Sequence, residues 1–249
     1  MKNKIDINCD LGEGMPNDAR IMPFISSANI ACGFHAGNVD LIKSTIDLCL
    51  QHEVHIGAHP SYHDRTNFGR TAIKLSDEEL YDLMILQIQL LDTAAKKAGA
   101  SLHHVKPHGA LYNMAGRDRQ MAFIISTAIH DYDASLILYG LANSLLSEEG
   151  IKAGLNVYQE TFADRTYLDN GQLTSRSNNN ALIEDEEEVA KQVLELLNGS
   201  ITSVDVKEIL VNADTICIHG DGPHAHSFAK IIYRTLEENG IQLMKTSIR

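Results

Sequence analysis

The stretch INCDLGEG, residues 7–14, places an Asp at the end of a short strand-like run. Five later segments of the chain repeat this arrangement, in which an apolar run leads directly to ionisable side chains. They are ANIACG before His35, HIGA before His59, HHVKPHG with Lys106 and His108, ETFADR with Asp164 and Arg165, and TICIHGD with His219 and Asp221. The carboxyl ends of parallel strands meet on one side of a barrel or an open parallel sheet. The recurrence therefore predicts an α/β enzyme.

Seven segments are candidates for strands: 4–9, 27–32, 54–58, 102–106, 135–139, 156–161 and 214–218. Most are short apolar runs, which are typical of parallel strands buried on both faces beneath helices. The tail GIQLM (240–244) is a candidate for an eighth strand, so the sequence leaves open whether seven or eight strands form the sheet. We expect one domain over residues 1–249, because no repeat, linker or low-complexity tract divides the chain.

Helices are predicted between these strands. Ser76 and Glu79 form a capping box, and Gly99 marks the end of the helix that follows it. The other predicted helices cover 39–51, 118–130, a segment that opens at 184–189, and a last segment from about 223 to 240. The stretch YLDNGQL (167–173) predicts a hairpin excursion, because Asn-Gly stands between strand-like flanks.

Composition narrows the class of partner. The chain of 249 residues has a formal charge of −12, from 33 acidic and 21 basic residues. This balance argues against nucleic acid or an anionic membrane as a partner, and it leaves room for a small anion.

The 4 Cys suit buried positions in a reducing compartment. With no apolar segment that resembles a leader or a membrane span, we expect a soluble cytoplasmic protein.

Asp10, His35 and His59 are the first candidate site residues. An Asp beside Gly is often a turn residue, but Asp10 ends a strand, which favours catalysis or ligand binding over the turn role. We expect Glu13 to be structural or to lie at the rim. The two histidines follow neighbouring strands, so they and Asp10 are candidates for a two-His, one-carboxylate metal site. Metal-free acid–base chemistry is the alternative for the same three residues.

The later strands contribute cations and further acid–base groups. Lys106 precedes Pro107, which tends to end a strand, and a buried lysine requires an anion or a developing negative charge. Arg165 and Arg176 are candidates for binding a carboxylate, whereas Asp164 suits a site role and a salt bridge equally well.

The loop HGDGPHAH (219–226) joins a strand to a helix and is suited to an anion, with His219 and Asp221 flanking its turn. The chain lacks the phosphate-loop, dinucleotide and GxSxG motifs. From the residues alone we predict a hydrolase that acts on a small, anionic, amide-like substrate.

The blocks INCDLGEG, SSANIACGFHAG, IGAHPSY with NFGR, HVKPHGALYN, ETFADRTY and TICIHGDGPHA resemble, in this order, those of the family formed by the A subunits of ATP-dependent 5-oxoprolinase, also called the lactam-utilisation or LamB/YcsF family. The resemblance covers about residues 4 to 240. It implies a seven-stranded β/α barrel related to glycoside hydrolases and deacetylases. It also implies ATP-dependent opening of 5-oxoproline to glutamate, together with two partner proteins, the B and C subunits of 5-oxoprolinase.

The resemblance also suggests roles for the candidate residues. Asp10, with His59 or His219, would activate water, Lys106 and His108 would stabilise the oxyanion, and Arg165 or Arg176 would hold the substrate carboxylate. The remaining candidates are His35 and Asp164 for substrate binding and Asp221 for catalysis. Two other functions stay open: a metal-dependent deacetylase or amidohydrolase that uses Asp10, His35 and His59, and a non-catalytic component that binds substrate within a larger complex. The sequence leaves open whether ATP binds this chain or a partner.

Overall fold

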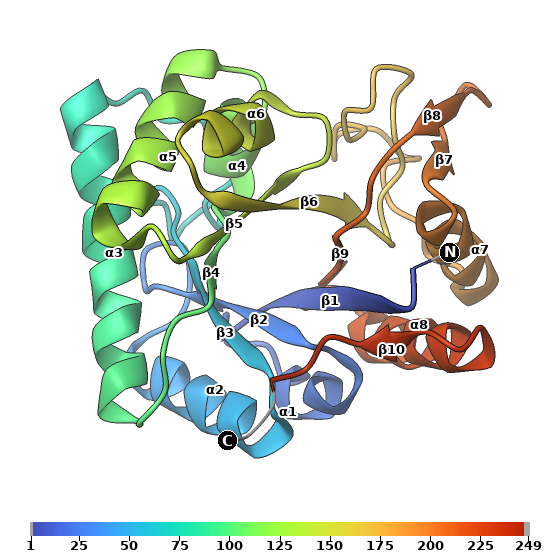
Figure 1. Ribbon diagram of the computed structural model, residues 1–249, viewed down its shortest axis with the longest axis horizontal. Coiled ribbons are helices and arrows are strands. Elements are labelled where there is room, and N and C mark those ends of the chain that lie inside the picture. The colour runs from blue at the N-terminus through green and yellow to red at the C-terminus, as the bar shows by residue number, and fades with distance from the viewer. Residues whose placement is uncertain (1, 247–249) are drawn as a thin grey trace.

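The structure is a computed structural model that describes residues 2–246, and its centre is a closed barrel of seven parallel strands (Figure 1). The strands are β1 (Lys4–Leu11), β2 (Ser27–Ala31), β3 (His55–His59), β4 (His104–Val105), β5 (Ile137–Leu141), β6 (Asn156–Phe162) and β9 (Thr215–His219). Each pairs with the next in this order, and β9 pairs back to β1 with Asp6 opposite Thr215. The predicted seven-stranded β/α barrel is confirmed.

Helices surround the barrel (Figure 1). They are α1 (Asp18–Ile21), the 3-10 helix η1 (Met22–Phe24), α2 (Val39–His52), α3 (Asp77–Lys97), α4 (Gly109–Ala115), α5 (Arg119–Asp133), α6 (Leu145–Lys152), α7 (Glu186–Leu197) and α8 (Ala225–Glu238). The predicted capping box is present at the start of α3, where Ser76 and Glu79 bond reciprocally. α3 packs on α5, and α7 packs on α8. Among the described residues, no helix combines the length and apolar character needed to cross a membrane.

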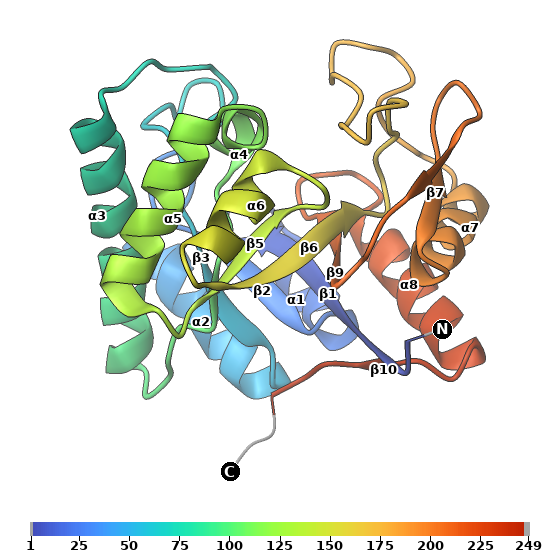
Figure 2. The same ribbon diagram turned by 45° about the horizontal axis from the view of Figure 1, so that its top comes forward.

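The tail does not contribute an eighth barrel strand. β10 (Gln242–Leu243) pairs only with the first residues of β1, placing Lys4 opposite Gln242, and lies outside the closed ring. β7 (Ser200–Thr202) and β8 (Glu208–Leu210) form a separate antiparallel pair. The excursion predicted over 167–173 is present as an antiparallel bridge between Tyr167 and Leu173. Loop 163–185, which contains this bridge, lies on the side toward which the barrel strands point (Figure 2).

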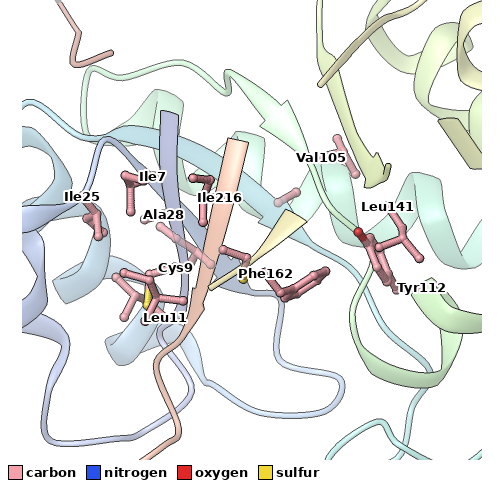
Figure 3. Close-up of a cluster of buried hydrophobic side chains, with 14 of the residues drawn as sticks. Ile7, Cys9, Leu11, Ile25, Ala28, Val105, Tyr112, Leu141, Phe162 and Ile216 are labelled. Atoms are coloured by element: carbon pink, nitrogen blue, oxygen red, sulfur yellow. The ribbon is translucent and has the colours of Figure 1, made fainter. Parts of the chain in front are cut away.

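The main hydrophobic layer lies between the barrel and its helices. Figure 3 shows part of this layer, with Ile7, Cys9 and Leu11 of β1 near Ile25 and near Ile216 of β9. Side chains alternate across a strand, so Asp6, Asn8 and Asp10 of β1 face the barrel interior. The prediction that the strands are buried on both faces is confirmed, but their inner face is rich in polar side chains. All 4 cysteines are buried and free.

The amino-terminal end of the barrel interior is filled by a hydrogen-bonded network, here called the base network. Asp6 accepts hydrogen bonds from the hydroxyls of Ser26, Ser27 and Thr215 at 2.7, 2.6 and 2.5 Å. Ser27 also meets the hydroxyl of Tyr139, across the barrel, at 3.1 Å. These contacts occupy the interior with polar groups that satisfy one another, and the bond between Ser27 and Tyr139 joins two strands that are not neighbours.

Candidate active site

Lys106 is the central cation of the carboxyl-terminal end of the barrel. It follows β4 and reaches across the interior, where its side chain is only 3% exposed. Its Nζ lies 2.9 Å from Asp10 Oδ1, 2.8 Å from Glu160 Oε1 and 3.0 Å from Cys217 Sγ. Burial disfavours the charged lysine, but Asp10, Cys217 and Glu160 outweigh it and hold the pKa of Lys106 well above its usual value. The sequence predicted that a buried Lys106 requires an anion, and the structure places the carboxylates of Asp10 and Glu160 beside it.

Asp10 is held as a carboxylate. It accepts from Asn29 Nδ2 at 2.7 Å and from Lys106, and its Oδ2 lies 3.4 Å from His59 Nε2. Burial opposes its negative charge, but His59 and Lys106 more than compensate and keep the pKa of Asp10 well below its usual range. Asp10 is therefore ionised at neutral pH and faces the candidate site.

His59 and His108 each turn one ring nitrogen toward the other. His59 Nδ1 donates to the carbonyl of Lys106 at 2.7 Å, and His108 Nε2 donates to the carbonyl of Phe68 at 2.9 Å. The remaining nitrogens, His59 Nε2 and His108 Nδ1, lie 2.9 Å apart. Two neutral rings with these tautomers would bring two lone pairs together, so the contact calls for a proton or a cation between them.

His35 and Glu13 complete the group of histidines. His35 Nδ1 bonds to Ser61 Oγ at 2.7 Å, and its Nε2 lies 3.1 Å from Glu13 Oε1. Burial and the neighbouring Asp10 raise the pKa of Glu13 well above its usual value, whereas burial and His59 lower the pKa of His35 to about 2. In this protonation state Glu13 donates to a neutral His35. Glu13 was predicted to be structural or at the rim, and the structure brings it to the rim and into the cluster.

His219 and Asp164 form a second acid–base pair. Asp164 accepts from His219 Nδ1 at 2.9 Å, and it also accepts from the His219 backbone N–H. Burial disfavours the carboxylate, but His219 outweighs this and lowers the pKa of Asp164. A carboxylate at Nδ1 fixes the tautomer in which Nε2 carries the lone pair, the arrangement of an oriented general base.

The two predicted arginine candidates differ in their availability. Arg165 is 5% exposed, and it donates to the carbonyls of Thr174 at 2.6 Å and Ala181 at 3.2 Å. Its guanidinium therefore secures loop 163–185. Arg176 is exposed and lines the cavity at the mouth of the barrel. A third arginine, Arg70, was not predicted and also lines this cavity, where it pairs with Asp221 at 2.5 Å.

A cavity of about 460 Å³ connects these groups. Its wall includes Asp10, Glu13, His59, Lys106, His108, Arg165, Arg176, His219 and Asp221. Of the predicted site residues, His35 and Asp164 do not line the cavity and instead contact residues that do. Glu160 and Tyr112 were not predicted from the sequence as site residues. The Tyr112 hydroxyl donates a hydrogen bond of 2.5 Å to Glu160 Oε2, next to Lys106. A polar residue on the inward face of strand 156–161 was the available signal for Glu160.

Fold and site together define a β/α-barrel protein with a buried, charged site at the carboxyl ends of its strands. The chain belongs to the LamB/YcsF family, whose model matches residues 5–248. A relative from Bacillus thuringiensis, named as the A subunit of 5-oxoprolinase, is 50% identical over 246 residues, which cover 96% of this chain and 97% of the relative.

Two solved structures support the same fold. The lactam utilization protein from Thermus thermophilus has a TM-score of 0.92 and 41% identity, with 98% of this chain and all of that protein covered. A polysaccharide deacetylase from Bacillus cereus has a TM-score of 0.50 and 13% identity, with 99% and 93% covered. The second likeness concerns the fold alone.

Proposed function

We propose that this chain is the A subunit of an ATP-dependent 5-oxoprolinase, which converts 5-oxo-L-proline, ATP and water to L-glutamate, ADP and phosphate. The observation that carries the proposal is the 50% identity, over nearly the full length of both chains, to a relative that bears this name. The site is consistent with this activity, since its small cavity combines acid–base groups with the cationic side chains of Lys106 and Arg176.

The chemistry explains why ATP is needed. A five-membered lactam is a poor electrophile, and ring closure competes with its hydrolysis. Transfer of the terminal phosphoryl group of ATP to the lactam oxygen makes that oxygen a leaving group. Water then adds to the ring carbon, and the nitrogen takes a proton as the carbon–nitrogen bond breaks. The acyl phosphate that results is hydrolysed by a second water to the carboxylate and phosphate. We propose that the B and C subunits, the partners predicted from the sequence, take part in handling ATP, because this chain has no phosphate-loop motif.

We assign the activation of water to His219. Asp164 holds its Nδ1, so Nε2 can accept a proton from water in the cavity. Asp10, which lies opposite His219 in the pairing of β1 with β9, stabilises the imidazolium that forms.

Lys106 acts through its charge. Its hydrogen-bond donors are already directed at Asp10, Glu160 and Cys217, so we do not assign it a free donor for the oxyanion. A fixed positive charge in a buried site still stabilises negative charge that develops nearby. For the substrate carboxylate we propose Arg176 rather than Arg165, because the Arg165 guanidinium is bound to backbone carbonyls.

Glutamate release from 5-oxoproline tests this proposal. The chain is assayed alone and with candidate B and C subunits, each with and without ATP. We expect glutamate only from the complete mixture with ATP, and the same mixture containing His219→Gln as a control should release far less. Glutamate released by this chain alone without ATP would favour a simple amidohydrolase. No glutamate under any condition, with all components folded, would contradict the proposal.

A further inference from the structure

Four buried side chains at the mouth of the barrel bring metal-binding atoms together. The ligand atoms of Glu13, His35, His59 and His108 all lie within 4.8 Å of one another. We call these four residues the rim donor group. They come from four different places in the chain: the loop after β1, the loop after β2, the end of β3 and the start of α4.

Each histidine of this group is oriented by a hydrogen bond at its outer nitrogen. His35 Nδ1 bonds to Ser61 Oγ, which itself donates to the Tyr62 carbonyl and therefore acts as the acceptor. His59 and His108 donate their outer N–H groups to backbone carbonyls. Such contacts fix the tautomer of a metal-binding histidine and direct the other nitrogen at the ion. His59 Nε2 and His108 Nδ1 therefore face each other, and His35 Nε2 faces Glu13, while the rings of His35 and His108 are stacked with centroids 3.8 Å apart.

The spacing of the four atoms matches one small ion. His59 Nε2 and His108 Nδ1 are 2.9 Å apart, His35 Nε2 and Glu13 Oε1 are 3.1 Å apart, and His108 Nδ1 and Glu13 Oε1 are 3.7 Å apart. In a tetrahedral zinc site with bonds of about 2.0–2.1 Å, the ligand atoms are separated by about 3.3 Å. These three of the six separations lie on both sides of this value, and all six are within 4.8 Å.

We propose that the rim donor group binds one divalent transition metal ion, with Zn²⁺ as the best match to three imidazoles and a carboxylate. Binding would replace the protons that otherwise separate these lone pairs. Four protein ligands make a closed site, so the ion would join the four segments that carry them. The ligand set differs from Asp10, His35 and His59, which the sequence offered as candidates beside metal-free chemistry, because Asp10 is engaged by Lys106 and Asn29. This inference is independent of the proposed function.

Direct metal binding tests the inference without any measurement of activity. The chain is freed of metal with a chelator, and Zn²⁺ is added in a titration calorimeter. Co²⁺ is added separately to record its absorption spectrum. We expect one ion per chain, a tetrahedral Co²⁺ spectrum and a higher melting temperature with Zn²⁺. Glu13→Gln and His108→Gln should each weaken binding by at least about tenfold.

Two further variants separate a missing ligand from a damaged fold. Ser61→Ala keeps all four ligands and removes only the bond that orients His35, so it should also weaken binding by about tenfold. His63→Gln alters a histidine outside the donor group and should bind Zn²⁺ as the natural chain does. A folded chain that binds no ion with Zn²⁺ in excess would overturn the proposal. Binding that persists unchanged in Glu13→Gln and His108→Gln would overturn it as well, by showing that the ion sits elsewhere.

Discussion

Histidines gather at both ends of the barrel, and their hydrogen bonding differs. At the base, His103 Nδ1 meets His104 Nδ1 at 3.2 Å, and His104 Nε2 donates to Asn29 Oδ1 at 2.8 Å. His55 stacks on His103 with ring centroids 3.8 Å apart. Two neutral rings fit this chain of bonds, because each contact pairs one donor with one acceptor. At the mouth, neutral His59 and His108 would instead present lone pairs to each other.

The comparison shows which buried polar group is available for chemistry. A network in which every donor has an acceptor contributes to the stability of one fold and has little capacity for a ligand. A network whose lone pairs converge needs protons, a cation or a substrate to complete it. We therefore assign stability to the base and function to the mouth. Variants at each end of the barrel test this division.

Lys106→Met should combine the largest losses of stability and turnover. Removing this cation leaves Asp10 and Glu160 buried without their positive partner, which costs about 3–5 kcal/mol of unfolding free energy. Denaturant unfolding at neutral pH measures this loss, and glutamate release by the reconstituted complex measures turnover. Adding Glu160→Gln should recover part of the stability, because it removes one unpaired carboxylate. A stable Lys106→Met chain with normal turnover would contradict the assigned role.

His219→Gln should lower turnover and leave stability nearly unchanged. The side chain is partly exposed, so its loss alters little packing. Removing a general base typically costs about 10²–10⁴ in rate. The measurement is glutamate release per folded molecule, with His224→Gln in the same loop as the matched control. Equal turnover in the two variants would assign water activation to another group.

Gly57→Ala should reduce stability through the base. An added Cβ would lie 2.0 Å from His104 Nε2, a buried ring that is hydrogen-bonded to Asn29. Overpacking of this kind costs about 1–3 kcal/mol, and occasionally more. Thermal unfolding measures the loss, and Gly116→Ala is a matched control for the loss of a glycine, since its φ is −62° and its added Cβ meets no atom closer than 3.5 Å. A Gly57→Ala chain as stable as the natural one would mean that the base tolerates displacement of His104.

Acidification should lower stability gradually through a single residue of the base. Burial and His55 lower the pKa of His103 from 6.5 to about 3, so between these values the unfolded chain binds a proton that the folded chain does not. The stability contributed by neutral His103 is therefore complete above pH 6.5 and is lost as the pH falls toward 3. Each such group adds at most about 1.4 kcal/mol per pH unit. In His103→Gln, the unfolding free energy should fall less steeply over this range, and an unchanged slope would contradict the assignment.

The sequence predicts much of this fold because the signals are local. Apolar runs locate all seven barrel strands, and the capping box at Ser76 locates the start of α3. The tail strand is different. Only the closing contact between β9 and β1 decides that β10 stays outside the ring, and that contact joins residues about 210 positions apart.

The candidate site is predicted in part. Asp10, His35, His59, Lys106 and His108 gather as expected, because residues at the ends of neighbouring parallel strands must approach one another. The pairing of Lys106 with Glu160 depends on which face of β6 turns inward, which short apolar runs do not specify. Arg165 donates to the carbonyls of Thr174 and Ala181 because loop 163–185 brings them to its guanidinium. The path of this loop cannot be predicted from the composition of the chain.

The sharpest test of the division between base and mouth compares Asp10→Asn with Asp6→Asn, two equal changes on the same inward face of β1. Unfolding free energy and glutamate release per folded molecule are measured for both chains in the reconstituted complex. We predict that Asp10→Asn loses at least about 10²-fold in turnover, and that Asp6→Asn loses about 1–3 kcal/mol of stability with normal turnover. Normal turnover in Asp10→Asn, or lost turnover in folded Asp6→Asn, would contradict this division.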